Sequence, residues 1–436
     1  MDHHETDHAD VVILGGGFTG ATLAYALADG QRRIIVYEAR KGPVTRFAGE
    51  LLHPGRLPVF GEELLARLRR RGADIRGFAV VPGRGQPATL LPYDEVETGR
   101  VGLGIDHATM VEELRAAAAE RPGVEIRYGA RAQAIFDDGY AIGVAAEDGH
   151  RTEAPVVLSA EGRHSRSRGH LGVPTDTQLV SFTAALRVPD ATLPHPGYGH
   201  VFLGAPGPIL AYPITPTDVR MCFDLPAGEQ ALETLRARLL AEYADFVPAP
   251  LHAAMLRALD EGQLQLVANH AISTGRCVEK GIALIGDAGG CAHPLTAAGM
   301  SVCLNDIGLI REELSGIEPE RATLADALHR FETRRYRFVR VRETLTDALY
   351  RLFDHDGPSG PALRQALFDH WNHSRAESVA LLSCMSSDGE LLRRQWGMVA
   401  LRALFDIGLG RSGPRLAAVR DLATFATDHV PKLFRI

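Results

Sequence analysis

Residues 10–20 read DVVILGGGFTG, an apolar run that ends in a cluster of glycines. The apolar part predicts a buried strand, and the stretch Ala21–Ala28 has the composition of a helix. Arg33–Tyr37 is a second apolar run of strand length. The sequence therefore predicts a β-α-β unit that begins almost at residue 10.

The glycines of this unit have the spacing of a dinucleotide-binding turn. Gly15 permits the tight turn, Gly17 lets the backbone approach a pyrophosphate, and Gly20 allows close packing of helix on strand. The helix N-terminus presents free N–H groups to the phosphates. Glu38 comes at the end of the second strand, where a carboxylate accepts hydrogen bonds from ribose hydroxyls. Together these features predict dinucleotide binding.

A second glycine motif appears late in the chain. Residues 281–288 read GIALIGDA, a buried strand that delivers Asp287 into a loop. The loop continues as HPLTAAGM at residues 293–300 into a helix near 299–314, whose N-terminus favours an anionic group such as a reduced flavin ring. An N-terminal glycine turn combined with a late strand-Gly-Asp is the layout of FAD enzymes, in which this aspartate binds the ribityl chain.

The order of predicted elements sets the fold class: α/β, with a glutathione-reductase-type FAD-binding Rossmann domain, an inserted mixed β-sheet substrate domain and a C-terminal helical region. Between residues 176 and 265 strand-like runs are broken by Pro and Gly, and after about 320 the chain reads as nearly all helical. The expected FAD-binding domain comprises 9–75, 105–175 and 266–318. The substrate domain comprises 76–104 and 176–265, and the helical region 319–436.

Composition and charge narrow the function further. Apolar residues make up 45% and charged residues 23% of the 436, as in ordinary globular proteins, and a net charge of −7 gives no case for nucleic acid. The five cysteines show no C-x-x-C spacing, so neither a disulfide framework nor a metal site is predicted. No signal peptide and no membrane span are apparent. We expect a cytoplasmic protein, with peripheral membrane contact open.

A third motif extends the comparison to a known family. Residues 158–168, LSAEGRHSRSR, resemble the Asp-Gly motif of flavin hydroxylases, with Glu161 in place of the aspartate. The three motifs together resemble the aromatic-hydroxylase class of FAD-dependent monooxygenases, and finer matches resemble the squalene monooxygenase (squalene epoxidase) family. The finer matches are RFAGELLHPG at 46–55, LPY at 91–93, the strands at 199–204 and 208–214, and the GD…HPLT…GM loop at 286–300.

The resemblance implies which residues form the site. It places Arg46 and Asp287 on FAD, and Tyr93 near the flavin beside a glutamine whose position is His53 here. Tyr93 and His53 are therefore the catalytic candidates, and no covalent flavin linkage and no metal are expected. The cofactor-binding candidates are Gly15, Gly17, Phe18, Thr19, Gly20, Glu38, Ala39, Arg46, Gly286, Asp287, Pro294, Ala298, Gly299 and Met300. Ala297 and Ala298 replace two glycines of the family loop, which leaves the backbone less freedom.

The implied function is monooxygenation: one oxygen of O2 enters a lipophilic substrate through a flavin C4a-hydroperoxide, most simply as epoxidation of an alkene in a terpenoid, prenylated or polyene compound. NAD(P)H is the ultimate electron donor, either directly or through a flavin reductase or other reductase partner. The alternatives are a hydroxylase of an aromatic or quinolone ring and an isoprenoid reductase. A halogenase is disfavoured because its W-x-W-x-I-P signature is missing.

A different class of function also stays open, that of a membrane-surface binding module. A run of six arginines and an amphipathic tail over residues 399–436 motivate it, although such a run is usually a solvated helix face. The arginines are Arg330, Arg334, Arg335, Arg337, Arg340 and Arg342.

Overall fold

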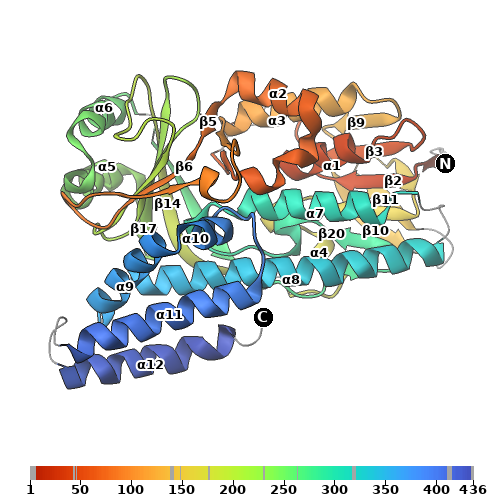
Figure 1. Cartoon of the computed structure of the whole chain (residues 1–436). Coiled ribbons are helices and arrows are strands. Elements are labelled where there is room, and N and C mark those ends of the chain that lie inside the picture. The colour runs from red at the N-terminus through yellow and green to blue at the C-terminus, as the bar shows by residue number, and fades with distance from the viewer. Residues whose placement is uncertain are drawn as a thin grey trace.

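The computed structural model describes residues 6–42, 45, 47–137, 142–147, 149–174, 177–228, 231–262, 264–316, 321–409 and 415–433. Within these residues the strands form four sheets, of six, seven, four and three strands. Figure 1 shows the six-stranded sheet near the N-terminus, the seven-stranded sheet at the far end, and the C-terminal helices beneath the latter. The predicted fold class is confirmed.

The six-stranded sheet has the order β19-β20-β13-β2-β3-β9, and its strands pair in parallel except at the β19 edge. Every residue of β2, β3 and β13 is buried, which is why these strands read as continuous apolar runs. The strands are β2 (Val11–Leu14), β3 (Ile34–Glu38), β9 (Val124–Tyr128), β13 (Val156–Ser159), β19 (Val278–Glu279) and β20 (Ile282–Leu284).

Three helices accompany this sheet: α1 (Phe18–Leu27), α3 (His107–Ala119) and α7 (Gly299–Glu313). Helix α1 contacts both α3 and α7. It begins at Phe18, three residues before the predicted start, because its first turn contains Gly20 and so lacks a helical composition. Beside the sheet, β1 (Asp7–His8), β10 (Ala132–Asp137), β11 (Ile142–Ala146) and β12 (Arg151–Glu153) form the four-stranded sheet.

The seven-stranded sheet has the order β18-β14-β17-β16-β15-β6-β7 and is antiparallel except for the pair β15–β6. Its strands are β6 (Gly77–Val81), β7 (Thr89–Pro92), β14 (Gln178–Val188), β15 (Gly199–Phe202), β16 (Ile209–Pro213), β17 (Val219–Pro226) and β18 (Leu264–Ala271). A three-stranded sheet consists of β4 (Leu51–Leu52), β8 (Gly102–Gly104) and β5 (Ala73–Ile75). Helix α2 (Gly61–Arg71) lies between β4 and β5 in the chain.

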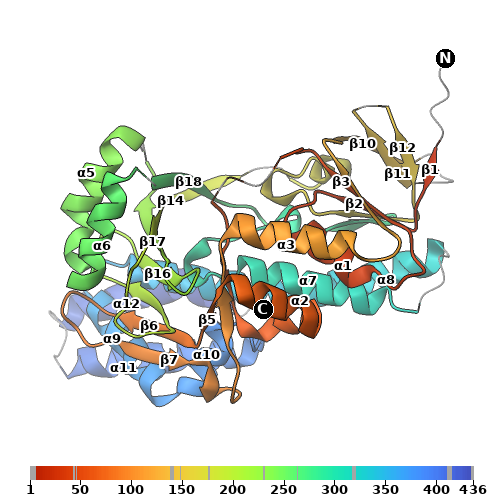
Figure 2. The same ribbon diagram turned by 90° about the horizontal axis from the view of Figure 1, so that it is seen from above.

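Side chains of the seven-stranded sheet alternate between two hydrophobic clusters. Ala184 and Ala211 belong to the cluster shared with α5 (Leu232–Glu242) and α6 (Ala249–Asp260). Their neighbours Ala185 and Tyr212 belong to the cluster shared with the C-terminal helices. This alternation is the period of two expected of a strand buried on both faces. Figure 2 shows α5 and α6 on the outer side of this sheet.

The C-terminal region is helical, as predicted. Helix α8 (Arg321–Phe353) runs along the molecule from the six-stranded sheet toward the remaining helices (Figure 1). These are α9 (Gly360–His373), α10 (Arg375–Leu382), α11 (Gly389–Gly408) and α12 (Arg415–Leu433). Helices α9 and α10 contact β7, so the tail packs directly on the seven-stranded sheet.

The arginine run on α8 is not a continuous basic face. Arg335 and Arg342 are buried, 1% and 4% exposed, and bond to groups within the protein. Arg330 and Arg334 are exposed but form ion pairs with Glu313, and Arg334 also with Glu312. The hypothesis that this run forms a membrane-binding surface is wrong for the two buried arginines, because α8 turns them toward the core. Among the described residues, no helix has the length and apolarity required to cross a bilayer.

Candidate active site

In the glycine turn after β2, two glycines have close neighbours and a third has open space around it. Gly15 has φ +94°, and a Cβ there would meet the Ala160 carbonyl oxygen at 2.7 Å. A Cβ on Gly20 would lie 1.7 Å from the Gly15 oxygen, so only glycine fits between helix and turn. A Cβ on Gly17 would meet nothing within 4 Å. The turn is therefore accessible at Gly17, where a phosphate group has room to approach.

The side chains of Phe18 and Thr19, the next two residues of the turn, lie in different surroundings. The Phe18 ring packs in the core, edge-on to Phe60 at 6.4 Å between ring centroids, so only its backbone faces the turn. Thr19 lies beside the late Gly-Asp loop: its Oγ1 is 3.2 Å from the position a Cβ on Gly286 would take. The two glycine motifs, distant in sequence, therefore meet at one edge of the six-stranded sheet.

Glu38 is bound to the same turn. Its Oε2 accepts from the Gly16 N–H at 2.9 Å, and its Oε1 accepts from the Arg40 N–H at 2.8 Å, two residues on and just past Ala39. Arg115, on α3, forms an ion pair with Glu38 at 2.9 Å and donates from Nε to the Gly16 oxygen at 2.6 Å. Sequence reasoning missed Arg115. Its signal was a single arginine followed by four alanines in a helix that packs on the sheet.

The late Gly-Asp loop is held by a buried ion pair between Asp306 and Arg335. Gly286 has φ +61°, and its N–H donates to Asp306 Oδ2 at 2.8 Å. Arg335 donates to the same Asp306 oxygen at 2.8 Å, and to the Gly286 and Gly289 carbonyl oxygens at 3.2 and 3.4 Å. Asp287 follows as the second residue of the turn Gly286–Gly289, partly exposed. Asp306 and Arg335 were also missed, since their role arises from contacts between α7, α8 and the loop.

The loop that leads into α7 forms a short turn, Pro294–Thr296. Ala297 ends it in the left-handed region, φ 49°, and Ala298 precedes the first residue of α7. Pro294 and Gly299 are exposed, and a Cβ on Gly299 would meet nothing within 4 Å. The N-terminus of α7 is thus open to a ligand, with its first N–H groups available. Met300 is buried and packs against Gly49, where a Cβ would lie 3.1 Å from its Cγ.

The two catalytic candidates are in contact. His53 and Tyr93 are both buried, and His53 Nδ1 lies 2.9 Å from the Tyr93 hydroxyl. His53 Nε2 lies 2.9 Å from the Thr296 carbonyl oxygen, which can only accept, so Nε2 carries the hydrogen. Burial lowers the pKa of His53 to about 4, so Nδ1 is unprotonated near neutral pH and accepts from Tyr93. Burial likewise raises the pKa of Tyr93 well above its usual range.

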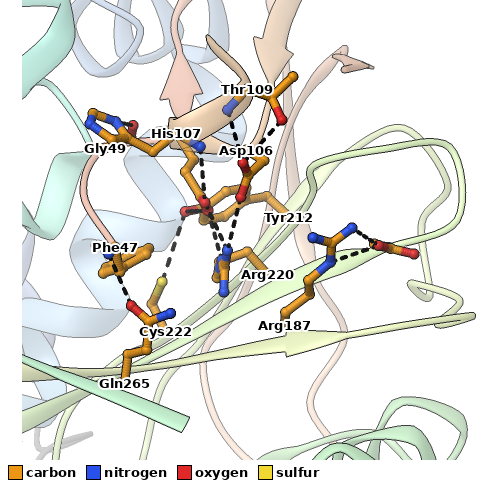
Figure 3. Close-up of polar contacts among 12 residues, drawn as sticks. Phe47, Gly49, Asp106, His107, Thr109, Arg187, Tyr212, Arg220, Cys222 and Gln265 are labelled. Atoms are coloured by element: carbon orange, nitrogen blue, oxygen red, sulfur yellow. Dashed lines mark hydrogen bonds and ion pairs between the residues drawn. The ribbon is translucent and has the colours of Figure 1, made fainter. Parts of the chain in front are cut away.

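The segment between Phe47 and His53 is fixed by a buried polar network, drawn in Figure 3. Glu50 and Arg220, 1% and 4% exposed, form two hydrogen bonds of 2.8 Å each. The Tyr212 hydroxyl donates to Glu50 at 3.3 Å, and Asp106 lies 3.7 Å from Arg220. Burial raises the pKa of Glu50, and the hydrogen bonds from Arg220 oppose that change. The network ties this segment to α3 and to β17.

A cavity of about 340 Å³ lies beside this network. Its lining residues are Asp106, Arg187, Arg220, Gly262, Leu264 and Gln265. Both arginines are engaged, Arg220 with Glu50 and Arg187 with Asp218 at 2.8 Å from Nε (Figure 3). Gln265 accepts from the Phe47 N–H at 2.9 Å. The cavity is polar and lies outside the cluster that holds Tyr93.

Arg46 and Glu161 are two charged residues that the sequence motifs singled out. Arg46 lies outside the described residues, so its predicted contact with FAD is not placed. Glu161 Oε2 accepts from Ser159 Oγ, Ser165 Oγ and the Ser167 N–H at 3.0, 2.9 and 3.2 Å, so its carboxylate is used within its own loop. Among the described residues, no group of three or more His, Cys, Asp or Glu side chains could hold a metal ion.

Comparisons with known proteins place the chain among FAD-dependent oxidoreductases. The family model described as squalene epoxidase matches residues 153–412, and the one described as FAD dependent oxidoreductase matches residues 10–91. Squalene monooxygenase SE1 of Panax ginseng is 30% identical over 377 residues, 83% of this chain and 69% of that protein. The squalene monooxygenase of Mus musculus is 29% identical over 411 residues, 91% of this chain and 71% of that protein.

Solved structures share the fold at lower identity. PqsL of P. aeruginosa, in complex with 2-aminobenzoylacetate, superposes with a TM-score of 0.67 at 23% identity, covering 86% of this chain and 99% of that one. HpxO of Klebsiella pneumoniae, complexed with FAD and uric acid, gives 0.72 at 20% identity, covering 88% and 98%.

Fold, site and relatives together define an FAD-dependent monooxygenase. Within that class, the chain belongs to the squalene epoxidase family.

Proposed function

We propose that the enzyme inserts one atom of O2 into an alkene of a lipophilic terpenoid, prenylated or polyene compound. One observation carries the proposal: Tyr93 lies in a hydrophobic cluster with Phe78, Leu345 and the turn residues Leu295 and Ala297. Such surroundings suit an uncharged chain better than a phenolate, which requires a cationic partner when buried. Membership of the squalene epoxidase family supports the same substrate class.

We propose that the FAD lies along the edge where the three motifs meet. Its pyrophosphate would lie at Gly15–Gly20 and its ribose at Glu38–Ala39. The ribityl chain would contact Gly286–Asp287, and the ring would lie beside Pro294 and the residues 298–300. The open positions at Gly17 and Gly299 fit this placement, because each leaves room where a side chain would otherwise stand. When bound, FAD supplies the redox chemistry and the activation of O2.

The protein's own groups orient this chemistry. We propose that Tyr93 and His53 act next to the flavin ring, with His53 holding the Thr296 carbonyl and Tyr93 held by His53. The apolar cluster around them excludes water and positions the substrate.

The reaction is tested under labelled O2 with prenylated candidate substrates, followed by mass spectrometry. An epoxide, or its cyclised product, that carries one labelled oxygen is the expected result. Labelled hydroxylation of an aromatic or quinolone ring would assign the enzyme to the hydroxylases instead. An unlabelled, reduced product would make it an isoprenoid reductase.

The electrons are proposed to come from NAD(P)H through a reductase partner, because the loop at 286–300 resembles that of the epoxidases. Stopped-flow measurement of flavin bleaching checks this. We expect slow bleaching by NADPH or NADH alone and faster bleaching when a general flavin reductase is added. Bleaching by a nicotinamide alone at catalytic rates would show direct reduction.

We further propose that the outer face of α11 and α12 contacts a bilayer surface, where a lipophilic substrate is collected. Seven large apolar side chains on and next to these two helices are exposed, a set well above the scattered single residues of an ordinary surface. They are Met398, Leu401, Leu404, Phe405, Leu409, Leu416 and Val419, with exposed fractions from 38% to 67%. Figure 1 shows both helices at the outer edge of the molecule.

A further inference from the structure

His293 stands directly before the turn Pro294–Thr296, and its ring makes contacts on both sides. Its Nδ1 accepts from the Leu295 N–H at 3.1 Å, which caps the turn. Its Nε2 lies 2.9 Å from Ser181 Oγ and 3.4 Å from Asp224 Oδ1. The ring therefore connects the turn to the seven-stranded sheet.

The direction of these hydrogen bonds is fixed. Because Nδ1 accepts, the ring hydrogen is on Nε2, which donates to Ser181 Oγ. Ser181 Oγ donates in turn to Asp224 Oδ1 at 2.7 Å and accepts a second bond from Asn269 Nδ2 at 2.9 Å. The serine hydroxyl thus uses its one hydrogen and both lone pairs. A change at Ser181 would remove the shorter of the two contacts of Nε2, and with it the hydrogen bond that the ring donates, without touching the turn.

The anchor lies on three adjacent strands. Ser181 is on β14, Asp224 on β17 and Asn269 on β18, and Ser181 is paired directly with Asn269 in the ladder. Ser181 is fully buried and Asn269 is 8% exposed, so the anchor belongs to the rigid part of the sheet. On its other side the His293 ring packs against Tyr350 of α8, with 4.4 Å between ring centroids.

The opposite end of the turn is held by different elements. The Thr296 carbonyl accepts from His53, and Thr296 Oγ1 is 3.0 Å from Thr346 Oγ1 of α8. One histidine thus holds the turn to the segment after β4, and the other holds it to the seven-stranded sheet. The position of the turn, and of the α7 N-terminus after it, depends on both.

We propose that His293, through Ser181 and Asp224, is a positioning residue that sets the turn Pro294–Thr296 relative to the seven-stranded sheet. The sheet and the turn bound the apolar cluster from two sides, so this link determines how a substrate lies relative to the flavin. This last consequence rests on the proposed monooxygenation, whereas the link itself does not.

Ser181→Ala tests the link in the FAD-loaded enzyme, and Thr183→Val is the matched control. Both changes remove one hydroxyl from β14 that accepts from Asn269, but only Ser181 contacts His293. In Ser181→Ala we expect amide hydrogen exchange over residues 295–300 to become about twofold to tenfold faster, as loss of one hydrogen bond predicts. The visible absorption spectrum of bound FAD should also change. Thr183→Val should alter neither.

The functional readout is the fraction of consumed O2 recovered in oxygenated product, which should fall in Ser181→Ala and not in the control. Equal exchange rates and equal spectra in the two variants would overturn the proposal. If Ser181→Ala does not fold, the same exchange and absorption measurements are made on His293→Asn, with the same expected changes. The shorter asparagine side chain can cap Leu295 but does not reach Ser181. Exchange and spectrum need no substrate, so failure to find any oxygenated product would count against the proposed reaction alone.

Discussion

At the scale of single residues, the buried pair His53 and Tyr93 is the feature with the clearest physical signature. Tyr93 belongs to an apolar cluster, and the buried His53 ring lies against Tyr93 and Phe78 of that cluster. Both ring nitrogens of the histidine are nevertheless used, by Tyr93 on one side and Thr296 on the other. A neutral imidazole with a fixed tautomer is stable here, whereas an imidazolium would be a charge buried in an apolar site.

This environment gives the free energy of unfolding a pH dependence. The pKa of His53 is about 4 in the folded chain against 6.5 ordinarily, so between these values only the unfolded chain binds the proton. His53 should therefore cost the native state stability as the pH falls from 6.5 to 4, by ~3 kcal/mol in total. Denaturant unfolding of the wild type and His53→Gln across this range measures the effect. Parallel curves for the two proteins would contradict it.

Ala297 is a second residue that affects the free energy of unfolding, through its backbone conformation. Its φ of 49° lies in the left-handed region, while Ala298 next to it has φ −84°. Ala297→Gly should raise stability by ~0.5–1 kcal/mol, because glycine adopts this conformation without strain. Ala298→Gly should lower it by about the same amount, because there glycine only adds freedom to the unfolded chain. Thermal unfolding of the FAD-loaded variants gives the comparison. A destabilised Ala297→Gly would show that the turn is not strained.

At the scale of elements, α8 connects the C-terminal helical region to the late Gly-Asp loop through Arg335. Arg335→Lys keeps the charge but loses the fork of bonds to the Gly286 and Gly289 carbonyls. We expect FAD binding to weaken at least tenfold, since each lost bond to a charged group is worth ~1.5–3 kcal/mol. Fluorescence titration of the apoprotein with FAD measures this. Arg334→Lys, one residue away and exposed, is the control and should leave the affinity unchanged.

Features that depend on local sequence patterns could be predicted, whereas contacts between residues far apart in the chain could not. The β-α-β unit, the late strand-Gly-Asp and the helical tail follow from local patterns and are present in the structure. The contact of His53 with Tyr93 was expected from the family resemblance, and the structure places the two rings together. The bonds of Arg115, Asp306 and Arg335 could not be predicted, because each joins elements far apart in the chain and leaves no periodic pattern.

At the scale of the whole molecule, the exposed apolar face of α11 and α12 gives a prediction about lipid binding. Leu401→Ser combined with Phe405→Ser should reduce vesicle binding more than tenfold, since two large apolar side chains are removed from the contact. Flotation with phosphatidylcholine vesicles measures the bound fraction. The control is Leu179→Ser with Tyr128→Ser, exposed apolar residues outside these helices. Sedimentation as a dimer that the first double variant abolishes would instead show that a second copy covers this face.

The packing of the tail on β7 has a consequence for the order in which the enzyme is made. Tyr93 emerges from the ribosome early, but the cluster that buries it includes Leu345, Phe368 and Trp396, which are synthesised last. The Gly286–Gly289 turn is held by residues up to Arg335, so a nascent chain completes this turn while the cluster around Tyr93 still lacks its last helices. With FAD placed as proposed above, such an intermediate would hold the ribityl side of the cofactor while its ring stays open to water.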